Sequence, residues 1–197
     1  MTPSGPAFVL SGPAGTVVAD GIATGYPEVA AAAAALRDGE ADVVVGALPF
    51  DLDNAAALFA PVSVTFGTAL PAWPSAPLPH VRIVEMVPAP PQHRARIRAA
   101  LDRLNEPGSP LQKVVLARAL RLVADGALDL PTLLHRLSTD PEASVYLADL
   151  SPAGAPFAGT ALVGASPELL VARAGSRVTC QPFAGSAPRA ADPDTDA

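Results

Sequence analysis

Apolar and polar residues follow two different spacings along the chain, and short breaks rich in Gly and Pro separate the segments. Short apolar runs with β-branched residues are typical of strands, whereas apolar positions that recur roughly every three or four residues are typical of helices. We therefore predict helices over residues 28–37, 91–104 and 130–137, and strands over residues 8–10, 16–19, 42–48, 81–87, 112–123, 144–150, 157–163, 168–173 and 177–181.

The order of these elements indicates the fold class. Residues 60–80 contain many prolines and the lone Trp73, which predicts a packed loop with short extended pieces. The second half is mostly strands, with a hairpin turn at residues 174–176. Because strands and helices do not alternate regularly, we expect an α+β fold with an antiparallel sheet and flanking helices.

Composition narrows the classes of function. The chain has 197 residues, of which 50% are hydrophobic and 16% charged, and this predicts a globular protein with a core. Its net charge of −6 argues against a nucleic-acid partner. The N-terminus resembles no signal peptide and no apolar run is long enough to cross a bilayer, so we expect a cytoplasmic protein without membrane contact.

A first candidate for chemistry is Lys113, which opens the segment Lys-Val-Val-Leu-Ala-Arg. Strand alternation would place Lys113 on one face with Val115 and Ala117. Burial lowers the pKa of a lysine from about 10.4, and a neutral amine can act as a general base. The alternative is a lysine at a strand end that reaches water.

A second candidate is Glu168 in the segment Gly-Ala-Ser-Pro-Glu-Leu-Leu-Val, which begins at Gly164. Glu168 follows a break at Pro167 and precedes apolar residues, so we expect it at the edge of buried surface. A carboxyl group there could hold a proton and donate it. The alternative is an ion pair with Arg118 or Arg173.

A third candidate is the turn Ala184, Gly185 and Ser186, where small residues could present backbone N–H groups and a hydroxyl to an anionic ligand. A turn without a ligand is the alternative. The three histidines lack the spacing of metal ligands, and the aspartates of the C-terminal tail lack the glycine and glutamate of a calcium loop. We identify no set of metal ligands in the sequence.

The three segments, in this order, resemble the chorismate-utilising enzymes, whose members include isochorismate, salicylate, anthranilate and aminodeoxychorismate synthases. The resemblance is closest to the isochorismate synthases and covers essentially the whole chain, including Val45-Gly-Ala-Leu-Pro-Phe-Asp51. It implies the fold of anthranilate synthase component I and chorismate as substrate. Ala117 and Phe183 stand where this family more commonly has Ser and Leu.

The resemblance also implies roles for the candidate residues. Lys113 matches the lysine that activates water for addition at C2 of chorismate, and Glu168 matches the acid that protonates the departing C4 hydroxyl. Ala184, Gly185 and Ser186 match the turn that borders the substrate. A lysine at position 113 favours a member that uses water rather than ammonia. Salicylate synthases share this lysine, so a salicylate synthase remains an alternative.

In this family Mg²⁺ is held by carboxylates of a later part of the domain, which has no counterpart in this sequence. We therefore expect residues 1–197 to be the N-terminal portion of a single chorismate-binding catalytic domain, truncated at its C-terminal end. A separately encoded C-terminal half is a possible partner under this interpretation. The alternative is an inert half-domain.

Overall fold

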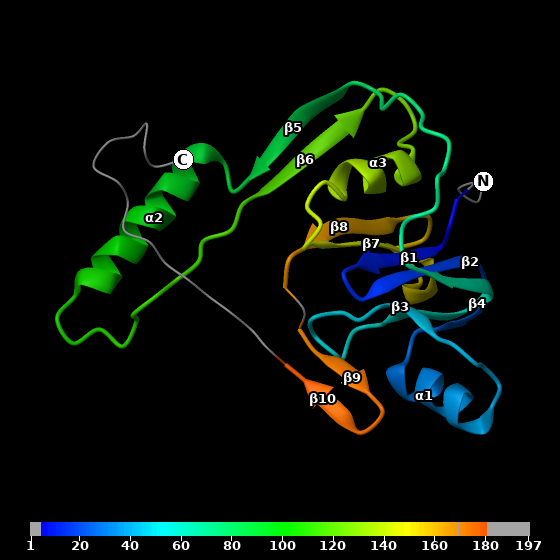
Figure 1. Cartoon of the computed structure of the whole chain (residues 1–197). Helices are drawn as coiled ribbons and strands as arrows, with labels where there is room; N and C mark the ends of the chain where they lie inside the picture. The colour runs from blue at the N-terminus through cyan, green and yellow to red at the C-terminus, as the bar shows by residue number, and fades with distance from the viewer. Residues whose placement is uncertain (1–4, 169, 181–197) are drawn as a thin grey trace. The chain divides into compact units, whose positions relative to one another are not determined.

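The chain forms two compact units in a computed structural model that describes residues 5–168 and 170–180 (Figure 1). Unit 1 is built from residues before position 76 and after position 129, and unit 2 is built from residues 76–129. The helices are α1 (Val29–Asp38), α2 (Pro90–Asn105) and α3 (Leu130–Leu137). None of the helices within the described residues has the length and apolar character needed to cross a membrane.

Unit 1 contains a sheet of six antiparallel strands in the order β3-β4-β2-β1-β7-β8. Its central pair is β2 with β1, and β1 also pairs with β7, from which unit 2 separates it in the sequence. The strands are β1 (Phe8–Gly12), β2 (Gly15–Tyr26), β3 (Val45–Ala47), β4 (Ala57–Gly67), β7 (Ser144–Asp149) and β8 (Ala161–Ser166).

One face of this sheet, which we call the covered face, carries the main core. Residues directly opposite each other on paired strands project to the same side. Helix α3 lies over β7 and β8 and inserts the fully buried Leu134 (Figure 1). Leu70, Trp73 and Leu130 pack against the same cluster. One cross-strand row of the covered face consists of Thr65, Val18, Val9, Leu147 and Val163.

The opposite side of the sheet, which we call the open face, has apolar side chains at the surface. Two of its rows consist of Phe66, Val17, Leu10, Tyr146 and Gly164, and of Val64, Ala19, Phe8, Ala148 and Leu162. A smaller cluster that includes Ala19, Val45 and Phe59 covers the β3–β4 end of this side.

Unit 2 consists of β5 (Val81–Val87), helix α2 and β6 (Ala119–Ala124), and it has little core. The strands pair in antiparallel fashion. Every residue of β5 is exposed, and α2 has no buried residue. The apolar side chains Ile97 and Leu101 of α2 are 37% and 51% exposed, so the apolar side predicted for this helix is not packed among the described residues.

A small hairpin completes unit 1. Its strands are β9 (Ala172–Ala174) and β10 (Arg177–Thr179), and a 3-10 helix η1 (Ser151–Ala153) follows β7. The hairpin turn predicted at residues 174–176 is confirmed, and Gly175 adopts the positive φ of 60° that glycine tolerates without strain.

The predicted α+β class with an antiparallel sheet is confirmed, but several strand limits were wrong. Residues 60–67 of the predicted 60–80 loop belong to the long strand β4, because Pro61 falls next to an irregularity in the β2–β4 register, where a missing N–H is tolerated. Residues 157–160 form a hydrogen-bonded turn, which delays β8 until Ala161. Only Val45–Ala47 of the 42–48 run belongs to a strand, and among the described residues of the 168–173 run only Ala172 and Arg173 do, as part of β9.

Candidate active site

Lys113 lies in unit 2, between α2 and β6, on a segment that forms no strand. The strand predicted from residue 112 begins instead at Ala119. Its partner β5 ends at Val87, and Pro88 has no N–H with which to continue the ladder. Within the described residues, nothing else pairs with residues 112–118. The Lys113 side chain is therefore exposed rather than placed on a buried strand face.

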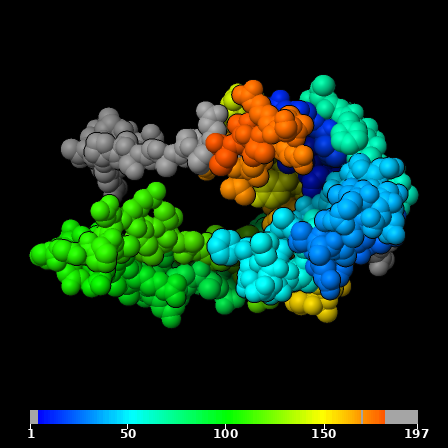
Figure 2. Space-filling view, turned by 90° about the horizontal axis from the view of Figure 1, so that it is seen from below, coloured from blue at the N-terminus to red at the C-terminus, as the bar shows by residue number. Residues whose placement is uncertain are grey.

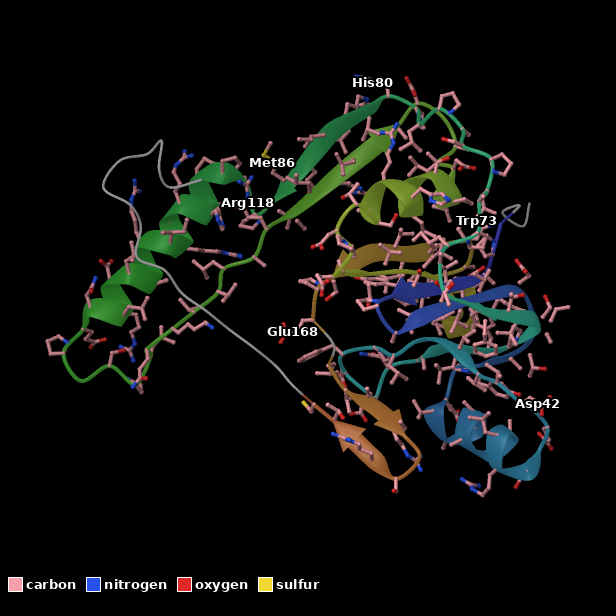
Figure 3. All side chains as sticks on the ribbon, in the orientation of Figure 1. Asp42, Trp73, His80, Met86, Arg118 and Glu168 are labelled. Carbon is pink, nitrogen blue, oxygen red and sulfur yellow. The ribbon has the colours of Figure 1, made fainter. Side chains whose placement is uncertain are left out.

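The segment after Lys113 is apolar but exposed. Val114, Val115 and Leu116 are 40%, 80% and 37% exposed. At its end the Arg118 guanidinium donates a hydrogen bond to the Met86 sulfur on β5, 3.1 Å away (Figure 3). This contact holds the segment where it enters β6. The exposed apolar side chains that precede it are typical of a strand without its partner.

Glu168 lies in unit 1, directly after β8, in a turn held by the Ser166 hydroxyl. The Glu168 N–H donates to the Ser166 hydroxyl, and this hydroxyl donates to the Glu168 carbonyl, both at 3.3 Å. The Glu168 side chain is exposed (Figure 3). Leu170 and Val171 are 82% and 53% exposed, so the buried surface expected beside Glu168 is absent from the described residues.

The alternative interpretation of Glu168 as an ion-pair partner receives no support in the described part of the chain. The Arg173 side chain donates instead to the Gly175 carbonyl at 2.8 Å. The Arg118 side chain is bonded to the Met86 sulfur. Neither the Lys113 ammonium nor the Glu168 carboxylate forms a salt bridge within the residues that the structure describes.

Tyr146 is a neighbour of the Gly164–Glu168 segment that the motifs alone did not indicate. It is paired directly with Gly164 in the β7–β8 ladder. A Cβ built at Gly164 would lie only 2.6 Å from Tyr146 Cζ, so the tyrosine ring occupies the space that the glycine leaves. An aromatic residue on a strand opposite a glycine is the sequence signal that could have revealed this pair.

The two proposed catalytic side chains belong to different units, Lys113 to unit 2 and Glu168 to unit 1. Ala184, Gly185 and Ser186 lie outside the described residues. Among the described residues, no three His, Cys, Asp or Glu side chains gather in a group that could hold a metal ion. These residues therefore do not fit a magnesium site by themselves.

The curated proteins that are similar to this chain include two named as isochorismate synthases. The chain is 55% identical over 193 residues to a Mycobacterium tuberculosis protein named as an isochorismate synthase, MenF. The matched region covers 98% of this chain and 52% of that protein. Isochorismate synthase DhbC of Bacillus subtilis is 32% identical over 209 residues, and this match covers 96% of this chain and 52% of DhbC. The chain thus spans about half the length of these curated relatives.

A solved structure extends the comparison to the fold. A protein described as a 2,3-dihydroxybenzoate-specific isochorismate synthase, DhbC, of Bacillus anthracis superposes with a TM-score of 0.68 and is 29% identical, covering 97% of this chain and 52% of the other. The model of the chorismate binding enzyme family matches residues 73–197. The resemblance indicated by the three motifs is confirmed, and the chain belongs to the chorismate binding enzyme family.

Proposed function

We propose that this chain supplies one half of an isochorismate synthase domain that converts chorismate to isochorismate. The observation that carries the proposal is the 55% identity across 98% of the chain to a relative named as an isochorismate synthase. The reaction adds water at C2 and removes the C4 hydroxyl, so it needs a base and an acid. We assign these roles to Lys113 and Glu168.

The assignment requires that both side chains be available to substrate. Both are exposed in their units, and neither is engaged in an ion pair within the described residues. A functional group that is not committed to a structural contact remains available for substrate. Lys113 and Glu168 also lie in segments whose neighbouring apolar residues are exposed, so further polypeptide packed on each segment would exclude water from it.

The remaining site groups complete the proposal. Ala184, Gly185 and Ser186, by their match to the third motif, would border the bound substrate through backbone N–H groups and a hydroxyl. The family also implies Mg²⁺, for which the described residues offer no ligand cluster. We derive no step through this ion and expect its ligands in a part of the domain that the described residues do not include.

The test is conversion of chorismate, followed by chromatography of the product. We expect the 197-residue chain alone to be inactive even with excess Mg²⁺, and the chain co-expressed with the remaining half of the Mycobacterium tuberculosis relative to produce isochorismate. Glu168→Gln should reduce this turnover by about 10²- to 10⁴-fold, because an amide cannot deliver the proton that the leaving hydroxyl needs.

A variant of the following hairpin provides the control. Arg173→Gln removes a charge close to Glu168 in the sequence without changing the proposed acid, and it should retain turnover within about threefold. An assembled protein that converts chorismate normally with Glu168→Gln contradicts the role of Glu168. Salicylate as the product would instead assign the chain to the salicylate synthases, and absence of any product from a folded assembly would indicate an inert half-domain.

A further inference from the structure

The Ser166 hydroxyl joins the end of β8 to the proposed acid. It accepts a hydrogen bond from the Glu168 N–H and donates one to the Glu168 carbonyl, both at 3.3 Å. A serine hydroxyl that bonds the backbone two residues later takes over hydrogen bonds that a continuing strand would otherwise make. The Ser166 side chain therefore holds the backbone of Glu168 on both sides of its Cα.

Pro167, between these two residues, restricts the backbone further. A proline ring fixes its own φ at about −65° and keeps the residue before it in the extended region. Pro167 has no N–H, so the Glu168 N–H is the first backbone donor after Ser166. The path from β8 to Glu168 is thus set by one proline ring and one hydroxyl, and the hydroxyl is the group that bonds to Glu168.

Strand β8 gives this hydroxyl a firm base. Val163 packs against the core cluster of the covered face. Gly164, the next residue, lies under the Tyr146 ring on the open face. Because successive residues of a strand project to opposite sides, β8 is held from both sides of the sheet just before Ser166.

The chain after Glu168 offers no comparable support among the described residues. Leu170 and Val171 are exposed, and so are all residues of β9 and β10. Figure 2 shows unit 1 hollowed between the cyan segment near residue 50 and the orange β9–β10 hairpin. Within the part of the chain that the structure describes, the position of Glu168 therefore depends on β8 and the Ser166 hydroxyl.

We propose that Ser166 is a positioning residue for the reaction, whose hydroxyl orients the Glu168 backbone so that the carboxyl group meets the departing C4 hydroxyl of chorismate. A general acid must lie within hydrogen-bond reach of the oxygen that it protonates, and a displacement of about 1 Å can cost about 10²-fold in rate. Ser166 does not touch the substrate in this role. The inference rests on the proposed function, because it presupposes that Glu168 is the acid.

The first test measures turnover of chorismate by the assembly with the remaining half of the Mycobacterium tuberculosis relative. Ser166→Ala should lower kcat by about ten- to a hundredfold and change KM by less than about twofold, because the acid is displaced while the substrate contacts remain. Ser144→Ala is the matched control, since Ser144 is paired directly with Ser166 and is also half-buried. The Ser144 hydroxyl lies over Gly12, so kcat should stay within about twofold.

A second pair of variants separates the hydroxyl from packing. Ser166→Thr keeps a hydroxyl and should retain kcat within about threefold, whereas Ser166→Val has the same shape without it and should lose as much as Ser166→Ala. This comparison decides the point even if Ser166→Ala does not fold. The emission of Trp73, which packs on the covered face, reports folding of each variant. Equal kcat values for Ser166→Thr and Ser166→Val would overturn the inference.

A double-mutant cycle distinguishes positioning from a general structural effect. Without the acid, Ser166 has no carboxyl group to position, so adding Ser166→Ala to Glu168→Gln should change the residual turnover by less than about twofold. A merely structural role would lower the residual turnover by the same factor as in the parent. That result would also overturn the inference.

Exchange of the Glu168 amide keeps the inference separate from the proposed function. In the 197-residue chain alone, this N–H should exchange at least about threefold faster in Ser166→Ala than in the parent, because its acceptor is lost. Normal turnover by Ser166→Ala would reject the inference and leave the function standing. If no assembly converts chorismate, the proposed function fails. Equal exchange in the two proteins would then reject the hold of Ser166 on Glu168 as well, and faster exchange in Ser166→Ala would sustain it.

Discussion

Unit 1 and unit 2 both contain helices and strands, but they differ in how many apolar side chains of these elements are buried. In unit 1, Leu134, Leu147 and Val9 form a fully buried cluster between α3 and the sheet. In unit 2, a helix and a two-stranded sheet occur with no buried residue on α2 or β5. A two-stranded sheet without a packed apolar side is marginally stable in water.

This difference in packing affects how firmly each unit holds its proposed catalytic side chain. Glu168 follows a strand of the well-packed unit, whereas Lys113 lies on an irregular segment of the poorly packed one. A general base must be held within hydrogen-bond reach of the water that it activates. Lys113 therefore needs contacts beyond those within unit 2, whereas Glu168 starts from a backbone position fixed by β8.

The largest expected effect concerns the poorly packed unit. In the co-expressed assembly, Lys113→Gln should lower turnover of chorismate by about 10²- to 10⁴-fold while leaving the KM nearly unchanged, because a base is lost and the substrate contacts remain. Steady-state kinetics measure both quantities. Arg98→Gln, a charge loss on the exposed side of α2, should stay within about twofold. Turnover of Lys113→Gln within twofold of the parent would refute the role.

Next in size is an effect on the core of unit 1. Leu134→Ala should destabilise the chain by about 2–5 kcal/mol, because it leaves a cavity beneath α3. Urea unfolding followed by Trp73 emission measures this, since Trp73 packs on the same cluster. Arg136→Ala on the exposed side of α3 is the control and should change stability by less than about 0.5 kcal/mol. Equal effects of the two variants would show that α3 is not a core element.

A smaller effect on stability is expected in β8, the strand that precedes the proposed acid. Gly164→Ala should cost about 1–3 kcal/mol of stability, because the new methyl group overlaps the Tyr146 ring. The same urea experiment measures it. In the double variant Gly164→Ala with Tyr146→Ala, the methyl group has room, so the combined loss should be smaller than the sum of the single losses. Strict additivity would mean that the ring does not lie over Gly164.

The smallest effect tests the poor packing of unit 2 directly. Leu101→Ala in the isolated chain should change stability by less than about 0.5 kcal/mol, because Leu101 is 51% exposed and alanine favours the helix. Thermal melting followed by circular dichroism detects the change. A loss like that of Leu134→Ala would show that α2 packs on other residues of the chain.

The fold was predictable where local pattern and packing agree. Helix α3 matches its predicted limits because Leu130, Leu134 and Leu137 lie on one side and all reach the core cluster. Strand β5 also matches its prediction. The strand expected at Lys113 was wrong because apolar alternation indicates a strand only where a partner is present, and β5 is too short to pair with residues 112–118.

The candidate site was predictable to a smaller extent. The order of the three motifs indicated the family, which the comparisons confirm. The position of Tyr146 over Gly164 depends on the register between β7 and β8, which a pattern within either strand does not contain. The assignment of Lys113 and Glu168 to separate units likewise follows from contacts distant in sequence.

The pairing of β1 with β7 has a consequence for how the chain folds during synthesis. Leu70 and Trp73 before unit 2, and Leu130 after it, pack against one cluster, so unit 2 is an excursion that leaves and returns at the same place. The ribosome must complete β7 before β1 finds its second neighbour. Such high contact order slows folding and leaves one edge of β1 unpaired meanwhile. Replacing unit 2 by a short linker would shorten this wait and accelerate closure of the sheet.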